Sequence, residues 1–133
     1  MESIIRKLRR KNQPVPVPLD LPDEDQLLDI EEGLLISLPK DYRTFLLRAS
    51  NLVIGKLEPA TAADPNSHTY LADLMAEAWN QGLPREMIPI CADRGNYYCL
   101  NLEEAVQLWT PKGFTEDEWS SIWDWAEEVW LNS

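Results

Sequence analysis

Soft metal ligands and flexible residues are scarce in this sequence, which has two cysteines, one histidine and five glycines in 133 residues. Two cysteines are too few for a disulfide framework, and with one histidine they cannot provide the four soft ligands of a zinc site. The glycines are scattered, so no glycine-rich loop is present to cradle a nucleotide phosphate. The sequence therefore predicts a protein with no bound metal and no cofactor, in a reducing compartment such as the cytoplasm.

Long hydrophobic runs and positive charge are scarce as well. No apolar run approaches the ~20 residues that a membrane-spanning helix needs. The 12 basic residues against 23 acidic ones give a net charge of −11, a balance that repels polyphosphates. We therefore expect no membrane segment and no nucleic-acid binding.

Positive charge gathers at the N-terminus, where residues 1–11 carry +4, which leaves −15 on the rest of the chain. Alternating prolines follow at 14–18 and favour an extended connector rather than the apolar stretch of a secretory signal. We interpret residues 1–18 as a basic, proline-rich arm, a short helix or arm followed by a stiff connector, and favour a tail over a core element. Residues 19–133 then form one domain, in line with the usual domain size.

Hydrophobic periodicity and capping residues divide the remaining chain into helices and strands. The segment 24–32 begins after Asp23, which with Gln26 forms a capping box. Helices are predicted at 24–32, 39–49, 69–81 and 116–131, and strands at 52–57, 87–92, 97–102 and 106–109. Because short turns join the last three strands, the pattern predicts an α+β fold with a mostly antiparallel sheet flanked by helices.

The predicted hairpin contains both cysteines and one proline in a strand. Pro89 has no N–H to donate, so its strand should lie at a sheet edge or carry a bulge. A loop over 93–96 would place Cys91 opposite Tyr98 and the two thiols on different faces of the sheet. A three-residue loop would instead place the thiols opposite each other. We favour free, buried thiols.

The predicted C-terminal helix has an apolar arc formed by the residues Trp119, Ile122, Trp123, Ala126, Val129 and Trp130. Asp117, Asp124 and Glu128 gather on the opposite side. Trp125 falls at the border between the two arcs. It is therefore the aromatic residue that core packing explains least.

The order and spacing of several motifs resemble the SUKH superfamily, also called Smi/Knr-like. The motifs are the run Leu38 to Leu47, then Asn51, Ile88-Pro89-Ile90, Asp93, Gly95 to Leu100, Val106 with Trp109, and the Trp-rich end. The resemblance covers about 23–131. It implies an α+β domain, and among bacterial members an immunity protein that binds and neutralises a toxin, often a nuclease or deaminase. It implies no shared catalytic residue.

A search for an active site leads to the same expectation. His68 stands alone in a polar loop, and no nucleophile elbow is present. The acidic clusters 23–25 and 116–118 start predicted helices, where carboxylates complement the helix dipole, and 103–104 lies in a turn. We therefore predict no catalytic, metal-binding or cofactor-binding residue and no enzymatic activity. The enzyme alternative, a carboxylate-dependent hydrolase, would need acidic side chains converging in a pocket.

A binding surface is then the remaining functional feature. An acidic protein is steered toward a basic partner, and aromatic anchors within a charged rim supply affinity. We predict two candidate contact clusters, the first formed by Trp125, Asp124 and Glu128, the second by Asp93, Asn96 and Tyr97. The predicted function is an immunity protein that neutralises a basic bacterial toxin, and the alternative is a housekeeping regulatory or scaffold protein.

Overall fold

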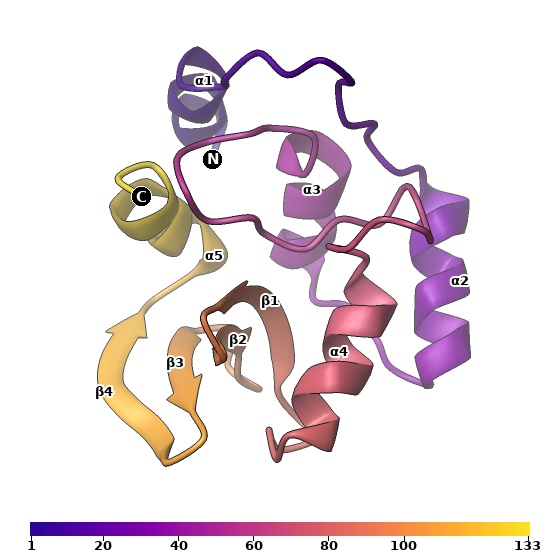
Figure 1. Cartoon of the computed structure of the whole chain (residues 1–133), viewed down its shortest axis with the longest axis vertical. Helices are drawn as coiled ribbons and strands as arrows, with labels where there is room; N and C mark the ends of the chain where they lie inside the picture. Colours follow the sequence, from indigo (N-terminus) through magenta and orange to yellow (C-terminus); the bar gives the residue numbers. More distant parts are fainter.

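The computed structural model describes all residues, 1–133, and forms a single α+β domain (Figure 1). Its helices are α1 (Glu2–Arg10), α2 (Glu24–Leu34), α3 (Lys40–Ala49), α4 (Leu71–Asn80) and α5 (Ile122–Trp125), which continues as the π-helix η1 (Ala126–Trp130). Its strands are β1 (Ile88–Asp93), β2 (Asn96–Leu100), β3 (Val106–Thr110) and β4 (Gly113–Trp119). The predicted α+β class and helices α2, α3 and α4 are confirmed, with ends shifted by one or two residues. No helix is long and apolar enough to cross a membrane.

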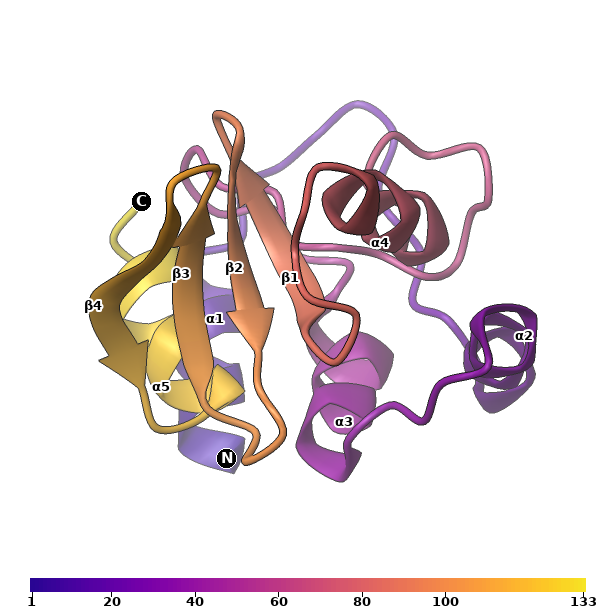
Figure 2. The ribbon, with the colours of Figure 1, turned by 90° about the horizontal axis from the view of Figure 1, so that it is seen from below.

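The four strands form one antiparallel sheet in the order β1-β2-β3-β4. Helices α1, α3 and α5 lie behind one face of the sheet, and α4 lies beside β1 (Figure 2). Side chains alternate along β2, so Tyr98 points into the large core cluster on the helical face. Tyr97 and Cys99 belong to a smaller cluster with residues of α4 and the loop that follows it.

The turn of the β1–β2 hairpin fixes the register of the two cysteines. Arg94 and Gly95 both have positive φ, at 51° and 88°, as a two-residue type I′ turn requires. Cys91 therefore lies opposite Tyr98, as the predicted loop over 93–96 requires. A bulge between Pro89 and Cys91, on the edge strand, shifts Cys99 opposite Pro89. Both thiols are free and buried, in different clusters.

The N-terminal segment packs more closely than its composition indicates. Ile5 and Leu8 are both 0% exposed and belong to the main core, where α1 contacts α3 and η1. Lys7 forms an ion pair with Glu127 at 2.7 Å. The interpretation of residues 1–18 as a tail is therefore wrong for α1, because its two buried apolar residues belong to the main core. The prolines that follow do form an extended connector.

Two further predictions are corrected by hydrogen bonding. The predicted strand 52–57 does not form, because Val53 bonds to the connector through its N–H to the Asn12 side chain (2.8 Å) and through its carbonyl to the Gln13 N–H (2.7 Å). The predicted helix 116–131 begins later. Its first residues belong to β4, where Trp119 pairs with Val106, and Ser121 caps the helix by accepting from the Asp124 N–H (3.1 Å).

We predict that Leu8→Ala lowers the free energy of unfolding by ~2–5 kcal/mol, the usual range for truncating a fully buried leucine. The control is Val17→Ala on the connector, where the side chain is 81% exposed and the change should stay within ~0.5 kcal/mol. Urea denaturation of the two variants measures the difference. Equal midpoints would show that α1 contributes nothing to the core.

Candidate protein-binding surface

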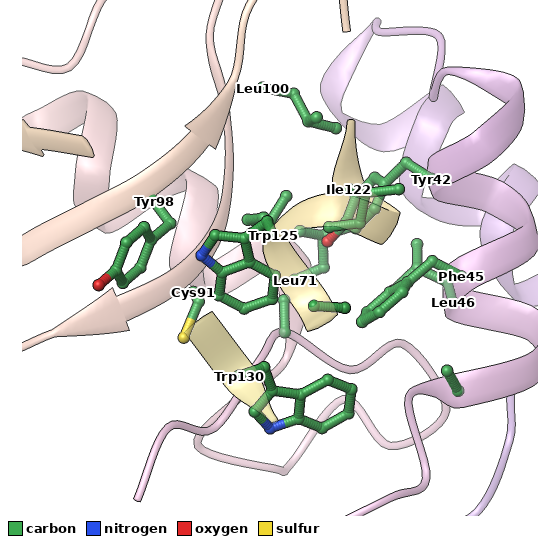
Figure 3. Close-up of a cluster of buried hydrophobic side chains, with 14 of the residues drawn as sticks. Tyr42, Phe45, Leu46, Leu71, Cys91, Tyr98, Leu100, Ile122, Trp125 and Trp130 are labelled. Atoms are coloured by element: carbon green, nitrogen blue, oxygen red, sulfur yellow. The ribbon is translucent and has the colours of Figure 1, made fainter. Parts of the chain in front are cut away.

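The first predicted cluster separates into a buried aromatic residue and accessible acids. Trp125 is 0% exposed, and its ring lies 5.4 Å from that of Tyr98 and 6.5 Å from that of Trp130 (Figure 3). Asp124 is half-buried and accepts a hydrogen bond from the Ser120 hydroxyl. Glu128 is exposed and takes part in no ion pair. Trp125 as an exposed anchor is therefore wrong, whereas the two carboxylates remain at the surface.

Trp125 is buried because its helix is enclosed on two sides. The helical wheel assumed one apolar face packed on the sheet, with solvent opposite. In the structure the sheet contacts Trp125 through Tyr98, while Trp123 and Trp130 contact Phe45 of α3 at ring distances of 5.7 Å each. A helix between two layers buries a wider arc than a surface helix does. The density of four tryptophans between 119 and 130 was the signal for this arrangement.

The second predicted cluster separates in the same way. Tyr97 is 3% exposed and packs against Trp109, with ring centres 6.1 Å apart, on the sheet face away from Trp125. Burial, together with the charge of Glu77, raises the pKa of Tyr97. Asp93 and Asn96 are half-buried and pair across the turn. The turn thus offers polar groups at the surface but no aromatic anchor from Tyr97.

An acidic bulge on β4 is the main surface feature that the sequence analysis assigned wrongly. The register between β3 and β4 shifts between Phe114 and Glu118, so several β4 residues lie opposite one residue of β3. The exposed residues Glu116, Asp117 and Glu118 lie in and beside this bulge, and none forms an ion pair. They are strand residues, not the start of a helix. The signal in the sequence was Gly113, which has a positive φ of 118° where the chain turns from β3 into β4. A hairpin predicted at this glycine would have placed the three acids on a strand.

The charge of the last 38 residues of the chain is nearly all of one sign. From Asn96 to Ser133 the sequence contains eight carboxylates and a single cation, Lys112. One carboxylate, Glu127, is paired with Lys7 of α1. The remaining acids lie in the loop after β2, in the β4 bulge and on the C-terminal helix. This surface attracts cations over a long range.

A hollow of about 440 Å³ borders Asp93 of the second predicted cluster. Its lining residues are Lys56, Leu57, Asp93, Arg94, Tyr98, Val129 and Ser133. Asp93 comes from the predicted turn cluster, and Val129 follows Glu128 of the other cluster. Of the six predicted contact residues, only Asp93 lines this depression, which we call the Tyr98 hollow.

A second groove, of about 210 Å³, lies between the connector and the loop that follows α3. Its walls are mostly apolar, with Val15 and Leu19 on one side and Leu52 on the other. His68 lines this groove and pairs with Glu58, and both side chains are largely exposed. The single histidine thus contacts one carboxylate and no nucleophile.

The remaining candidates for chemistry are the thiols and the acidic clusters. Burial raises the pKa of Cys91 and of Cys99 to about 12, with a smaller contribution from Asp93 at Cys91. Such thiols stay protonated at neutral pH and are poor nucleophiles and poor metal ligands. No group of three or more His, Cys, Asp or Glu side chains is arranged to hold a metal ion.

Comparison with known proteins agrees with the α+β class of the fold. The family described as SMI1-KNR4 cell-wall (SUKH_5) matches residues 1–131. The chain belongs to this SMI1-KNR4 family. It is also similar to a protein from Pseudomonas syringae pv. tomato with a crystal structure, at 53% identity and a TM-score of 0.97 over 100% of both chains. No curated protein matches the sequence significantly. The family match includes α1.

We predict that Trp125→Ala destabilises the protein by ~3–5 kcal/mol, because removing a fully buried indole leaves a large cavity. Glu128→Gln, three positions further on the exposed side, should change stability by less than ~0.5 kcal/mol. Denaturant melts of both variants measure these differences. A Trp125→Ala protein with wild-type stability would restore this residue as a surface anchor.

Proposed function

We propose that the protein is an immunity protein, which neutralises a basic bacterial toxin by binding to it directly. The observation that carries the proposal is the acidity of residues 96–133, which hold eight carboxylates and one cation. A nuclease or deaminase that acts on nucleic acid is basic where it grips phosphates. An acidic protein reproduces the field of that substrate and is steered onto the same surface. Membership of the SMI1-KNR4 family supports a role in protein binding.

The β4 bulge is the proposed centre of the charged contact. Glu116, Asp117 and Glu118 are exposed and unpaired, so no intramolecular ion pair has to break before they meet a cation. The bulge also leaves residues of β4 without a pairing partner on β3. Phe114, which is 43% exposed at the start of the same strand, offers apolar area next to these charges.

Neutralising the bulge tests this proposal. The variant Glu116→Gln/Asp117→Asn/Glu118→Gln should lower the association rate with the cognate toxin domain by ~10-fold or more at low salt. It should also flatten the salt dependence of that rate. The matched control Asp25→Asn/Asp29→Asn/Glu32→Gln removes three exposed, unpaired charges from α2, on the other side of the molecule.

Binding kinetics and protection of cells that produce the toxin are the two measurements. The control variant should protect the cells as the wild type does, and the bulge variant should protect them less. Equal losses of protection in both variants would mean that net charge, and not the β4 bulge, determines binding. Full protection by the bulge variant at wild-type rates would contradict the proposed contact.

We propose further that the protein acts without catalysing a reaction. The two thiols are held protonated by burial, and the partner of His68 is the exposed carboxylate of Glu58 rather than a hydroxyl or thiol group. The acidic clusters lie apart, on β4, at the start of α2 and in the loop after β2. Inhibition of a toxin by binding needs none of these groups to react.

The state of the thiols gives a direct test. With a pKa of about 12, Cys91 and Cys99 should not react with an aromatic disulfide reagent at pH 8 while the protein is folded. Both should react within minutes in concentrated guanidinium chloride, which exposes them. Rapid reaction of either thiol in the folded protein would instead indicate an accessible nucleophile and reopen the enzyme alternative.

A further inference from the structure

Helix α2 and the residues at its two ends carry exposed leucines at a regular spacing. Leu28 is 48% exposed, Leu35 directly after the helix is 91% exposed, and Leu21 just before the helix is 40% exposed. They follow one another at intervals of seven residues, which span about two helical turns. We call Leu21, Leu28 and Leu35 the α2 leucine row. Figure 2 shows α2 at the outer edge of the molecule, where the row is open to solvent.

Carboxylates surround the central leucine of this row. On a helix surface, the neighbours of a residue lie three and four positions before and after it. All four of these positions around Leu28 hold acids, namely Glu24, Asp25, Glu31 and Glu32. Arg43 of α3 pairs with Glu24 and Glu31, whereas Asp25 and Glu32 take part in no ion pair. An apolar side chain within a charged rim has the composition of an interface anchor.

The C-terminal end of α2 adds to the negative charge of this face. The carbonyl end of a helix carries a partial negative charge, so basic residues are favourable in the last turn. Helices α1 and α3 have such residues, but the last turn of α2 has none and contains Glu32 instead. A cation from outside would be attracted by Glu32 and by the helix end together. The charges of this face therefore favour a basic partner.

Leu35 has a backbone conformation that favours glycine. Its φ of 55° and ψ of 47° lie in the left-handed region. Gly33 lies two residues earlier with open space around it, yet the helix continues through this glycine and ends at the leucine. Because Leu35 is almost fully exposed, burial within the chain does not offset the cost of this conformation. Burial against a partner would offset it.

We propose that the α2 leucine row is a docking face for a basic amphipathic helix of a partner protein. The apolar stripe of that helix would pack on Leu28 and Leu35, and its lysines or arginines would meet the surrounding carboxylates. The row and the β4 bulge lie at opposite ends of the molecule (Figures 1 and 2). The inference therefore does not depend on the toxin contact and gives the protein a second partner.

A second copy of the chain does not meet these requirements. Another α2 would bring the same carboxylates against this face, and like charges repel each other. The basic helix of the chain is α1, but its apolar residues Ile5 and Leu8 are fully buried in its own core. It can therefore offer charge to the row but no apolar stripe.

Titration of the full chain with three synthetic peptides of about 18 residues tests the docking face. The first peptide has leucine on one helical face and lysine elsewhere, the second has glutamate in place of lysine, and the third has serine in place of leucine. With the first, amide NMR signals of Leu28, Glu32 and Leu35 should shift and saturate at roughly 100 μM. The glutamate peptide should leave these signals unchanged. The serine peptide should bind there at least ~10-fold more weakly, because it lacks the apolar contact.

Substitutions in the row should separate binding from folding. Leu28→Gln and Leu35→Gly should each weaken binding of the leucine–lysine peptide by ~5-fold or more. Leu35→Gly should melt at the wild-type temperature or above, since glycine adopts a positive φ without steric cost. The matched control is Leu102→Gln, which changes a 77% exposed leucine that precedes two glutamates in the loop after β2. This control should bind the peptide as the wild type does.

The docking face would be contradicted by the absence of a saturable shift at α2, by equal binding of the serine peptide, or by an equal loss in Leu102→Gln. Self-association of the chain that Leu28→Gln abolishes would make the occupant a second copy and contradict the proposed partner. The variant of the β4 bulge should bind the leucine–lysine peptide at α2 with wild-type affinity. Failure of the docking face and failure of the toxin contact are therefore measured on different variants.

Discussion

A continuous series of aromatic contacts joins the sheet to the helices, and the accessible surface is arranged around it. Tyr98 of β2 contacts Trp125, Trp125 stacks on Trp130, and Trp130 contacts Phe45 of α3 (Figure 3). Large rings bury much apolar area in fixed geometry, which fixes the distance between the layers. The same series fixes the position of the Tyr98 hydroxyl at its outer end.

Three polar atoms of this aromatic cluster are buried without a hydrogen-bond partner. The Tyr42 hydroxyl and the indole nitrogens of Trp125 and Trp130 are buried without a partner in the chain. Burial raises the pKa of the Tyr42 phenol above its usual range. Each unsatisfied group costs free energy, typically ~1–3 kcal/mol, so the packing of the rings has to outweigh that cost. A cluster with this composition tolerates few changes of shape.

Local signals in the sequence were sufficient for most of the fold. The capping box at Asp23, the turn around Gly95 and the missing N–H of Pro89 each act over a few residues, and the structure confirms all three. The family resemblance was confirmed as well. These features depend on backbone geometry close to the residue concerned. Packing between residues far apart in the sequence therefore has little influence on them.

Predictions failed where the outcome depends on distant packing. Whether Ile5 and Leu8 are buried depends on a gap between α3 and η1 that composition does not reveal. Whether Trp125 is exposed depends on a second layer over its helix. Residues 116–119 are compatible with a helix or a strand, and pairing with β3 decides. The polar members of the predicted clusters reach the surface, whereas their aromatic members, Trp125 and Tyr97, are buried, because bulky residues pack inside first.

Both edges of the sheet are blocked against further strands. At β1, the Ala60 N–H donates to the Ile90 carbonyl at 2.8 Å, and Pro59 bridges to Cys91. At β4, the bulge and its carboxylates repel an identical edge, since like charges would face each other. The chain can therefore accumulate to high concentration without copies joining edge to edge into fibres. For the proposed binding role, this leaves each molecule free of edge-to-edge partners.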